Sequence, residues 1–169
     1  MTETGYAPVN GLQMYYEVHG GEGGRPLVLL HGNLSTIGVD FGGIIPSLAR
    51  DRQVVGVEQQ AHGYTADIDR PLRIRHWADD TATLLAHLEI GQADLFGYSS
   101  GSAVAMQVAL DHPGLAGKLV LASFSYRLDG LHPGLTDNIG QLQPDHVTLV
   151  QRSDWLASMV GEFLDAEVG

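Results

Sequence analysis

A G-x-S-x-G pattern spans residues 97–101, and its central residue, Ser99, is the strongest candidate for nucleophilic chemistry in the chain. A short, mostly apolar stretch over 93–96 precedes the pattern and small and apolar residues follow it, which predicts a strand, a tight turn and a helix. The glycines on either side suit such a turn, because it leaves no room for a Cβ. The turn would raise the Ser99 hydroxyl above a sheet and aim the N–H of Ser100 at a developing oxyanion.

Strands alternate with helices in the rest of the chain. Residues 5–10 and 12–19 are predicted strands joined by Asn10-Gly11, a dipeptide favoured in tight hairpins. Apolar runs predict further strands over 26–30, 53–58 and 118–123, the last as a buried strand, and helical spacing predicts helices over 37–50 and 75–88. The expected fold is therefore α/β, a mostly parallel sheet of about six strands with an N-terminal antiparallel hairpin and helices on both faces. Active sites of such sheets lie at the carboxyl ends of the strands, where the pattern places Ser99.

Composition limits the partners. Twenty acidic and nine basic residues give a formal net charge of −11, which argues against a nucleic-acid partner. Without cysteine, neither disulfides nor thiolate chemistry is expected. The first residues show no signal-peptide pattern, and no apolar run approaches the roughly 20 residues of a membrane helix. A soluble cytoplasmic protein with no membrane partner is the resulting expectation.

These features together resemble a known superfamily. The hairpin, His31-Gly32 after one strand, Ala61-His62-Gly63 after the next and the pattern around Ser99 resemble the α/β-hydrolases, and most of all small bacterial esterase and haloperoxidase-like serine hydrolases. The resemblance is continuous over residues 5–135. It implies that Asn33, after the His-Gly pair, supplies a second oxyanion N–H beside that of Ser100, and that no cofactor is needed. A serine at position 99 excludes the aspartate nucleophile of dehalogenase and epoxide hydrolase relatives.

The resemblance weakens after residue 123. Family members normally continue with a helical cap and two more strands, but residues 124–145 are rich in glycine and proline, so the cap and last two strands are expected to be missing. The segment over 146–156 looks like the one that carries the family's catalytic histidine, which makes His146 the expected general base. Asp129 is the first candidate for the triad acid, with Asp137 and Asp145 as alternatives.

The chain is expected to form one domain over 1–169, with a core over 1–123, a shortened connection over 124–146 and a C-terminal helix over 147–169. An apolar stripe at helical spacing predicts that helix: Trp155, Leu156, Met159, Val160, Phe163 and Leu164.

The other histidines suggest structure more than chemistry. His31 and His62 each precede a glycine at a strand end, where a buried neutral imidazole can bond two loop backbones. The remaining ones lack the paired spacing with carboxylates that would indicate a metal site: His19, His76, His87, His112 and His132.

Two functions follow from the sequence. The first is a serine hydrolase of small carboxylic esters, acting through an acyl-enzyme on Ser99. The alternative is a catalytically weak or inactive relic of the fold that serves as a binding or oligomerisation module. Loss of the last strands would leave strand 118–123 as an open sheet edge, which proteins rarely tolerate, so a homodimer is expected, formed either edge to edge or by exchange of the helix over 155–164.

Overall fold

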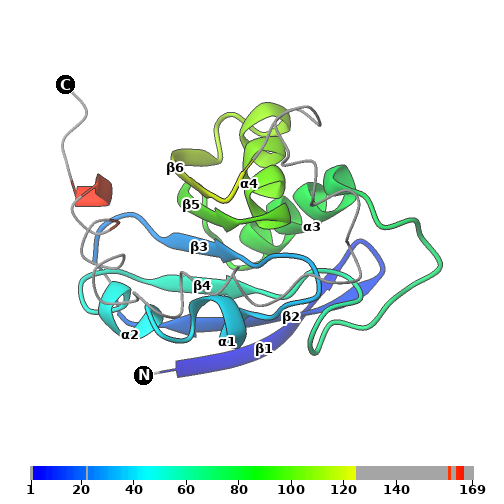
Figure 1. The fold of residues 1–169 in the computed structure, drawn as a ribbon, viewed down its shortest axis with the longest axis horizontal. Coiled ribbons are helices and arrows are strands. Elements are labelled where there is room, and N and C mark those ends of the chain that lie inside the picture. Colours follow the sequence, from blue (N-terminus) through cyan, green and yellow to red (C-terminus); the bar gives the residue numbers. More distant parts are fainter. Residues whose placement is uncertain (1, 22, 125–159, 161–162, 166–169) are drawn as a thin grey trace.

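The computed structural model describes residues 2–21, 23–124, 160 and 163–165 (Figure 1). Within that part of the chain the strands are β1 Thr2–Val9, β2 Leu12–His19, β3 Leu27–Leu30, β4 Val54–Val57, β5 Ala93–Tyr98 and β6 Ala116–Ala122. The helices are α1 Ile37–Phe41, α2 Ile45–Leu48, α3 Ile74–His87 and α4 Ser100–Asp111. None of these helices is long and apolar enough to cross a membrane.

The six strands form one sheet in the order β1-β2-β4-β3-β5-β6. Strand β2 pairs antiparallel with both β1 and β4, whereas β3 pairs parallel with β4 and β5, and β5 pairs parallel with β6. The predicted fold class is confirmed. Because β3 and β5 are parallel neighbours, the loops after their carboxyl ends lie at the same edge of the sheet.

The tight turn predicted at Asn10-Gly11 joins β1 to β2. Asn10 and Gly11 both have positive φ, 46° and 90°, which is the backbone shape that matches the twist of two antiparallel strands. The full register follows from this turn, with Val9 opposite Leu12 and Thr2 opposite His19.

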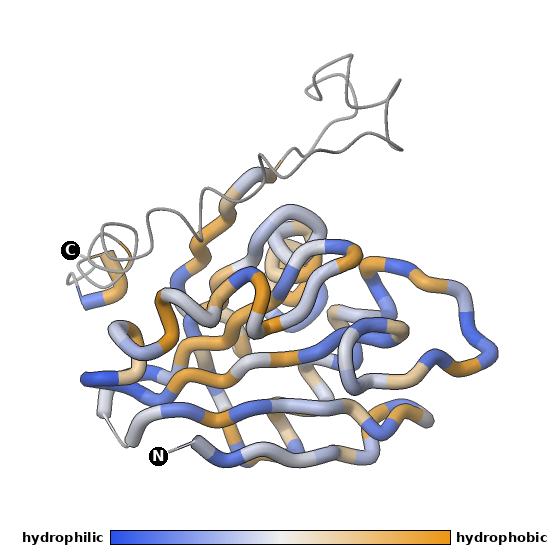
Figure 2. Tube along the Cα trace, turned by 60° about the horizontal axis from the view of Figure 1, so that its bottom comes forward, coloured by the Kyte–Doolittle hydropathy of each residue, from blue (hydrophilic) through white to orange (hydrophobic). Residues whose placement is uncertain are grey.

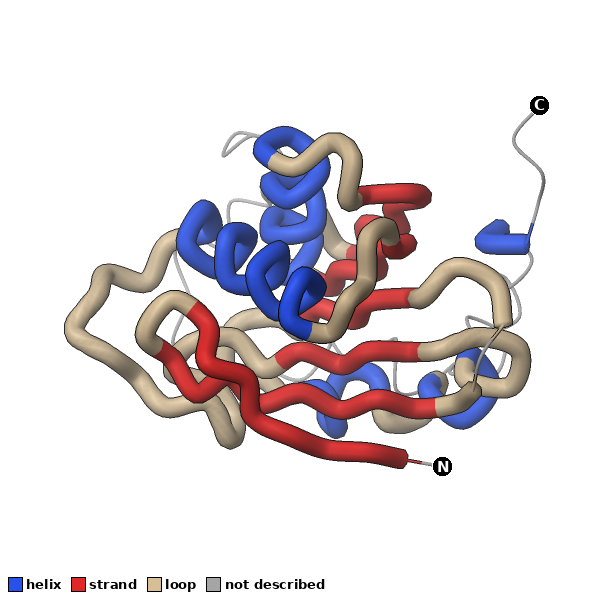
Figure 3. The backbone as a smooth tube through the Cα atoms, turned by 180° about the vertical axis from the view of Figure 1, so that it is seen from behind, coloured by secondary structure: helices blue, strands red, loops and turns tan. Residues whose placement is uncertain are grey.

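Helices cover both faces of the sheet (Figures 1 and 3). Val28 and Leu30 of β3 belong to the cluster that contains the apolar residues of α3 and α4, whereas Leu27 and Leu29 pack with those of α1 and α2. This alternation is the period of two that a strand imposes. The hydrophobic segments accordingly run along the central strands in Figure 2.

The single helix predicted over 37–50 is wrong. Helix α1 ends at Phe41 and α2 begins at Ile45, because Gly42 and Gly43 lie between them and favour the unfolded chain. Pro46 stands in the first turn of α2, where its missing N–H is harmless.

The prediction of a buried last strand is also corrected. Every residue of β6 is half-buried, because β6 lies at the end of the strand order and has a neighbour on one side only among the described strands.

The C-terminal stripe is only partly described. Val160 and Leu164 are buried against the face that α1 and α2 cover, as the apolar stripe predicts. Phe163 departs from that prediction, since it is 49% exposed and lies beneath the Lys118 ammonium, 5.6 Å from Nζ to the ring centre. Trp155, Leu156 and Met159 lie outside the described residues.

Candidate active site

Ser99 occupies the sharp turn between β5 and α4. Its φ of 53° and ψ of −118° are strained for a residue with a side chain. The Ser99 N–H donates to the Ala122 carbonyl at 2.9 Å, and the Ser99 carbonyl accepts from the Ser102 N–H at 3.0 Å. These bonds tie the strained residue to β6 on one side and to the first turn of α4 on the other.

The two glycines of the pattern are required by close backbone approach. A Cβ on Gly97 would overlap the Gly101 carbonyl, and a Cβ on Gly101 would overlap the Leu30 carbonyl at the end of β3. The tight turn into α4 therefore explains glycine at position 97, whereas packing of α4 against the end of β3 explains glycine at position 101.

The loop after β3 lies directly against this turn. A Cβ on Gly32 would lie 3.3 Å from the Ser99 Cβ and 3.4 Å from the Tyr98 ring. Asn33 follows and is exposed, while Ser99 is half-buried. Strands β3 and β5 lie side by side in the sheet (Figure 1). The structure thus brings Ser99 and the His31-Gly32-Asn33 segment together at the carboxyl ends of these two strands.

Two backbone donors at this place have no acceptor in the described part of the chain. Neither the Asn33 N–H nor the Ser100 N–H has a hydrogen-bond partner among the described residues. The Ser100 Oγ is also buried there without a partner in the same part of the chain. Unpaired N–H groups beside a serine hydroxyl are what an oxyanion would require.

His31 holds the loop from within the protein. The ring is fully buried, its Nδ1 lies 2.8 Å from the Gly32 carbonyl, and its Nε2 accepts the Gln59 N–H at 3.2 Å. Since a carbonyl only accepts, the proton sits on Nδ1 and the ring is neutral. Burial lowers the pKa of His31 to about 4, which agrees with this assignment. Its expected structural role, bonding two loop backbones, is confirmed.

His62 also follows a strand end but is less buried than His31. It is half-buried, its Nδ1 lies 2.9 Å from the Gln60 carbonyl, and its ring contacts those of His31 and Trp77. Trp77 is 5% exposed, as a core residue should be.

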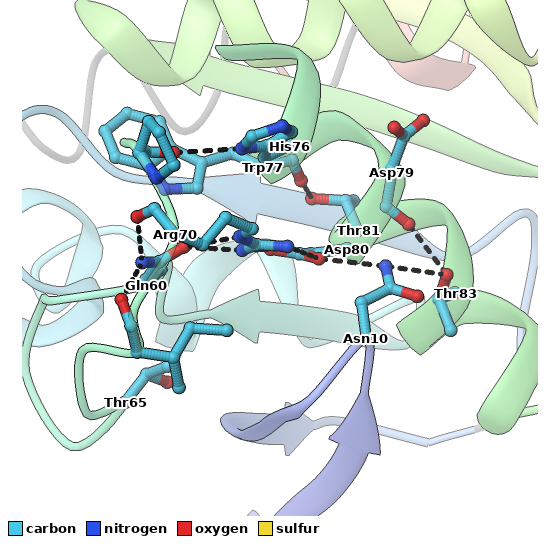
Figure 4. A network of polar contacts seen from close by, with 12 residues as sticks. Asn10, Gln60, Thr65, Arg70, His76, Trp77, Asp79, Asp80, Thr81 and Thr83 are labelled. Atoms are coloured by element: carbon cyan, nitrogen blue, oxygen red, sulfur yellow. Dashed lines mark hydrogen bonds and ion pairs between the residues drawn. The ribbon is translucent and has the colours of Figure 1, made fainter. Parts of the chain in front are cut away.

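A buried ion pair secures the loop after β4, which carries Gln59 (Figure 4). Asp80 of α3 is fully buried and binds both terminal nitrogens of Arg70, at 2.6 and 3.1 Å. Asn10 of the hairpin turn donates to the same carboxylate at 2.9 Å. Arg70 Nε donates in turn to the side-chain carbonyl of Gln60, also at 2.9 Å. The network ties the hairpin, α3 and this loop together.

The structure does not test the predicted general base and triad acid. His146 and Asp129 lie outside the described residues, as do Asp137 and Asp145. The segment over 124–146, in which the cap and strands are expected to be missing, is described only at Phe124.

Sequence reasoning missed two contributors, Asp40 and Gln59. Asp40 is 8% exposed, and its carboxylate accepts a hydrogen bond from the Gly32 N–H at 2.8 Å. The available signal was a lone acid between Ile37 and Phe41, on the apolar side of a predicted helix. Nothing in the sequence distinguishes Gln59 from the neighbouring Gln60.

Comparison with known proteins places this architecture in a family. The alpha/beta hydrolase fold family matches residues 25–163. The chain is 32% identical over 166 residues to the dihydrolipoyllysine-residue acetyltransferase component of the acetoin cleaving system of Pseudomonas putida, covering 94% of this chain and 41% of that protein. It is 33% identical over 110 residues to 2-hydroxymuconate semialdehyde hydrolase of Pseudomonas sp. (strain CF600), covering 62% of this chain and 38% of that one.

A solved structure agrees with these matches. The epoxide hydrolase CorEH, solved without ligand, superimposes with a TM-score of 0.67 and 26% identity, covering 76% of this chain and 48% of that chain. The chain thus spans less than half the length of each of these three relatives. With a strained serine between β5 and α4, a mixed six-stranded sheet and a family match over most of its length, the chain belongs to the α/β-hydrolase fold family.

Proposed function

We propose that the protein hydrolyses small carboxylic esters through an acyl-enzyme on Ser99. The observation that carries the proposal is the Ser99 turn, where a strained serine lies against the Gly32 loop, with the N–H groups of Asn33 and Ser100 unpaired among the described residues. Strain of this kind persists where a function requires it. The similarity to 2-hydroxymuconate semialdehyde hydrolase supports hydrolysis as the reaction class.

In the proposed reaction, the Ser99 Oγ attacks the acyl carbon while its proton passes to His146 as general base. The carbonyl π electrons move onto the carbonyl oxygen, which the Asn33 and Ser100 N–H groups stabilise. The alcohol then leaves with the proton from His146, and the acyl group remains on Ser99. Water, activated by His146, releases the acid and restores the serine. Asp129 is the proposed acid that orients the imidazole.

The test is hydrolysis of p-nitrophenyl acetate by the wild type and by Ser99→Ala. We expect the variant to lose about 10³-fold or more in kcat, because the nucleophile is removed while the fold is kept. Ser47→Ala is a matched control, since Ser47 lies in the short helix α2, outside both the Ser99 turn and the segment over 31–33, and the substitution should leave kcat unchanged. Equal rates for the wild type and Ser99→Ala would rule out an acyl-enzyme on this residue and leave the alternative, a binding or oligomerisation module.

A further inference from the structure

The backbone around Gly32 is held by buried side chains at almost every polar group. The His31 carbonyl accepts from the Gln59 side-chain amide at 3.1 Å, the Gly32 N–H donates to the Asp40 Oδ2 at 2.8 Å, and the Gly32 carbonyl faces the His31 Nδ1 at 2.8 Å. Gln59, Asp40 and His31 are 1%, 8% and 0% exposed. The two peptide units on either side of Gly32 have four polar groups, and these bonds hold three of them.

The fourth group is the Asn33 N–H, which has no partner among the described residues. In a trans peptide the N–H points away from the carbonyl of the same unit. Since the Gly32 carbonyl points inward at the His31 ring, the Asn33 N–H points the opposite way.

Because position 32 is a glycine, the loop needs these side-chain hydrogen bonds to hold its backbone in one conformation. Its Cβ would lie 3.3 Å from the Ser99 Cβ, tighter than an ordinary contact, so the close approach of the loop to the nucleophile favours glycine. Glycine also has the greatest backbone freedom of any residue. A loop that must pass this close to Ser99 therefore needs side chains from elsewhere to fix its orientation.

Asp40 connects both ends of the loop. Its Oδ2 accepts the Gly32 N–H, and its Oδ1 accepts the Ser35 hydroxyl at 2.7 Å. The Oδ2 lies 3.5 Å from the point where a Gly32 side chain would begin, beside the Ser99 Cβ. A buried carboxylate is costly unless donors satisfy it, and the Gly32 N–H and the Ser35 hydroxyl, which both donate to Asp40, belong to this loop. Its position between the buried Ile37 and Phe41 would suit an apolar residue if packing were its only role.

We infer that Asp40 is a positioning residue of the oxyanion hole: its carboxylate fixes the loop over 32–35 so that the Asn33 N–H points at the oxygen of the tetrahedral intermediate. The inference rests on the proposed function. Asp40 touches neither substrate nor the reacting atoms in this role, and it acts through the Gly32 backbone.

The test compares Asp40→Ala with Asp40→Asn. Asparagine keeps an oxygen for the Gly32 N–H, and its amide can donate to the Ser35 oxygen, whereas alanine loses both bonds. With p-nitrophenyl acetate and rates divided by titrated Ser99 sites, we expect Asp40→Ala to lower kcat about 10- to 100-fold with KM within threefold of the wild type. The inhibition constant of phenylboronic acid, which forms a charged tetrahedral adduct on serine, should rise by a similar factor. Asp40→Asn should restore kcat to within about fivefold.

Two further variants complete the design. Asp51→Ala, an exposed loop substitution, is the matched control and should leave both constants unchanged. Should Asp40→Ala fail to fold, Ser35→Ala decides, because it removes only one of the two bonds and is expected to lower kcat a few-fold. Unchanged kcat and boronate inhibition in the folded variants, or an Asp40→Asn as impaired as Asp40→Ala, would overturn the inference.

Failure of the proposed function gives a different result. The wild type would then show no Ser99-dependent hydrolysis, and the amide of Asn33 supplies a readout that needs no activity. We expect its ¹⁵N order parameter to be that of rigid backbone, about 0.85, in the wild type and below about 0.6 in Asp40→Ala. Equal order parameters in the two proteins would overturn the positioning role by itself.

Discussion

At the scale of single residues, the Ser99 turn restricts which residue can stand at position 101. A side chain on Gly101 would overlap the carbonyl of Leu30 on the neighbouring strand. We expect Gly101→Ala to lower the free energy of unfolding by about 2 to 3 kcal/mol, because backbone must move to admit the methyl group. Urea denaturation measures this difference.

Gly114 is the matched control for that substitution. A Cβ there meets nothing within 4 Å, so Gly114→Ala should change the free energy of unfolding by no more than about 0.5 kcal/mol. If the two alanine variants were equally stable, the close approach of α4 to the end of β3 would not be the reason for glycine at position 101.

His31 gives a pH dependence at the same scale. Burial lowers the pKa of His31 from 6.5 to about 4, although its bond to the Gly32 carbonyl acts in the opposite direction. As the pH falls below 6.5, the unfolded chain binds a proton that the folded protein refuses, so the free energy of unfolding falls until the pH reaches about 4. The loss is about 3 kcal/mol for a shift of this size.

The measurement is urea denaturation of the wild type and His31→Asn at pH 7 and pH 4.5. The difference in unfolding free energy between the two proteins cancels groups that both contain, such as Glu58, whose pKa burial raises. We expect the wild type to lose its advantage over the variant at the lower pH. A difference that is the same at both pH values would mean that His31 is not held neutral by burial.

At the scale of elements, what could be predicted was set by local sequence. The hairpin, β3, β4 and the β5-turn-α4 unit follow from alternation, apolar runs and Asn-Gly or Gly-x-Ser-x-Gly turns, all of which act within a few residues. The break between α1 and α2 was missed because apolar spacing continues through Gly42 and Gly43. The role of Asp40 was missed because it depends on contact with Gly32, which only the folded loop creates.

The same limit applies to the buried Asp80 carboxylate, which binds Arg70 in the loop after β4 and also Asn10 of the hairpin turn, 70 residues away in the sequence. Asp80 is fully buried, so Asp80→Ala leaves Arg70 and Asn10 without their shared acceptor. We expect the free energy of unfolding to fall by about 3 kcal/mol or more. The neighbouring Asp79 is 48% exposed and pairs with His112, so Asp79→Ala should cost about 1 kcal/mol at most. Similar losses for the two variants, measured by urea denaturation, would contradict a structural role for the buried pair.

At the scale of the whole molecule, the sheet ends at β6 among the described strands, and every residue of β6 is half-buried. An edge strand presents unpaired backbone groups that a second strand can bind. We therefore propose a homodimer formed through this edge, and light scattering at micromolar concentration should give a mass twice the chain's 18.1 kDa. A mass of one chain over the whole concentration range would contradict this proposal and leave the catalytic proposal untouched.

The proposed function depends above all on a single property: the turn at residue 99 presents a reactive hydroxyl, and the N–H groups of Asn33 and Ser100 are available to the oxyanion, having no partner in the part of the chain that the structure describes. Labelling with a fluorophosphonate, read by intact mass and peptide mapping, tests this most directly. The account predicts rapid addition of one label per chain, located on Ser99, and none on Ser99→Ala. No label on the folded wild type, or a label at another residue, would contradict it.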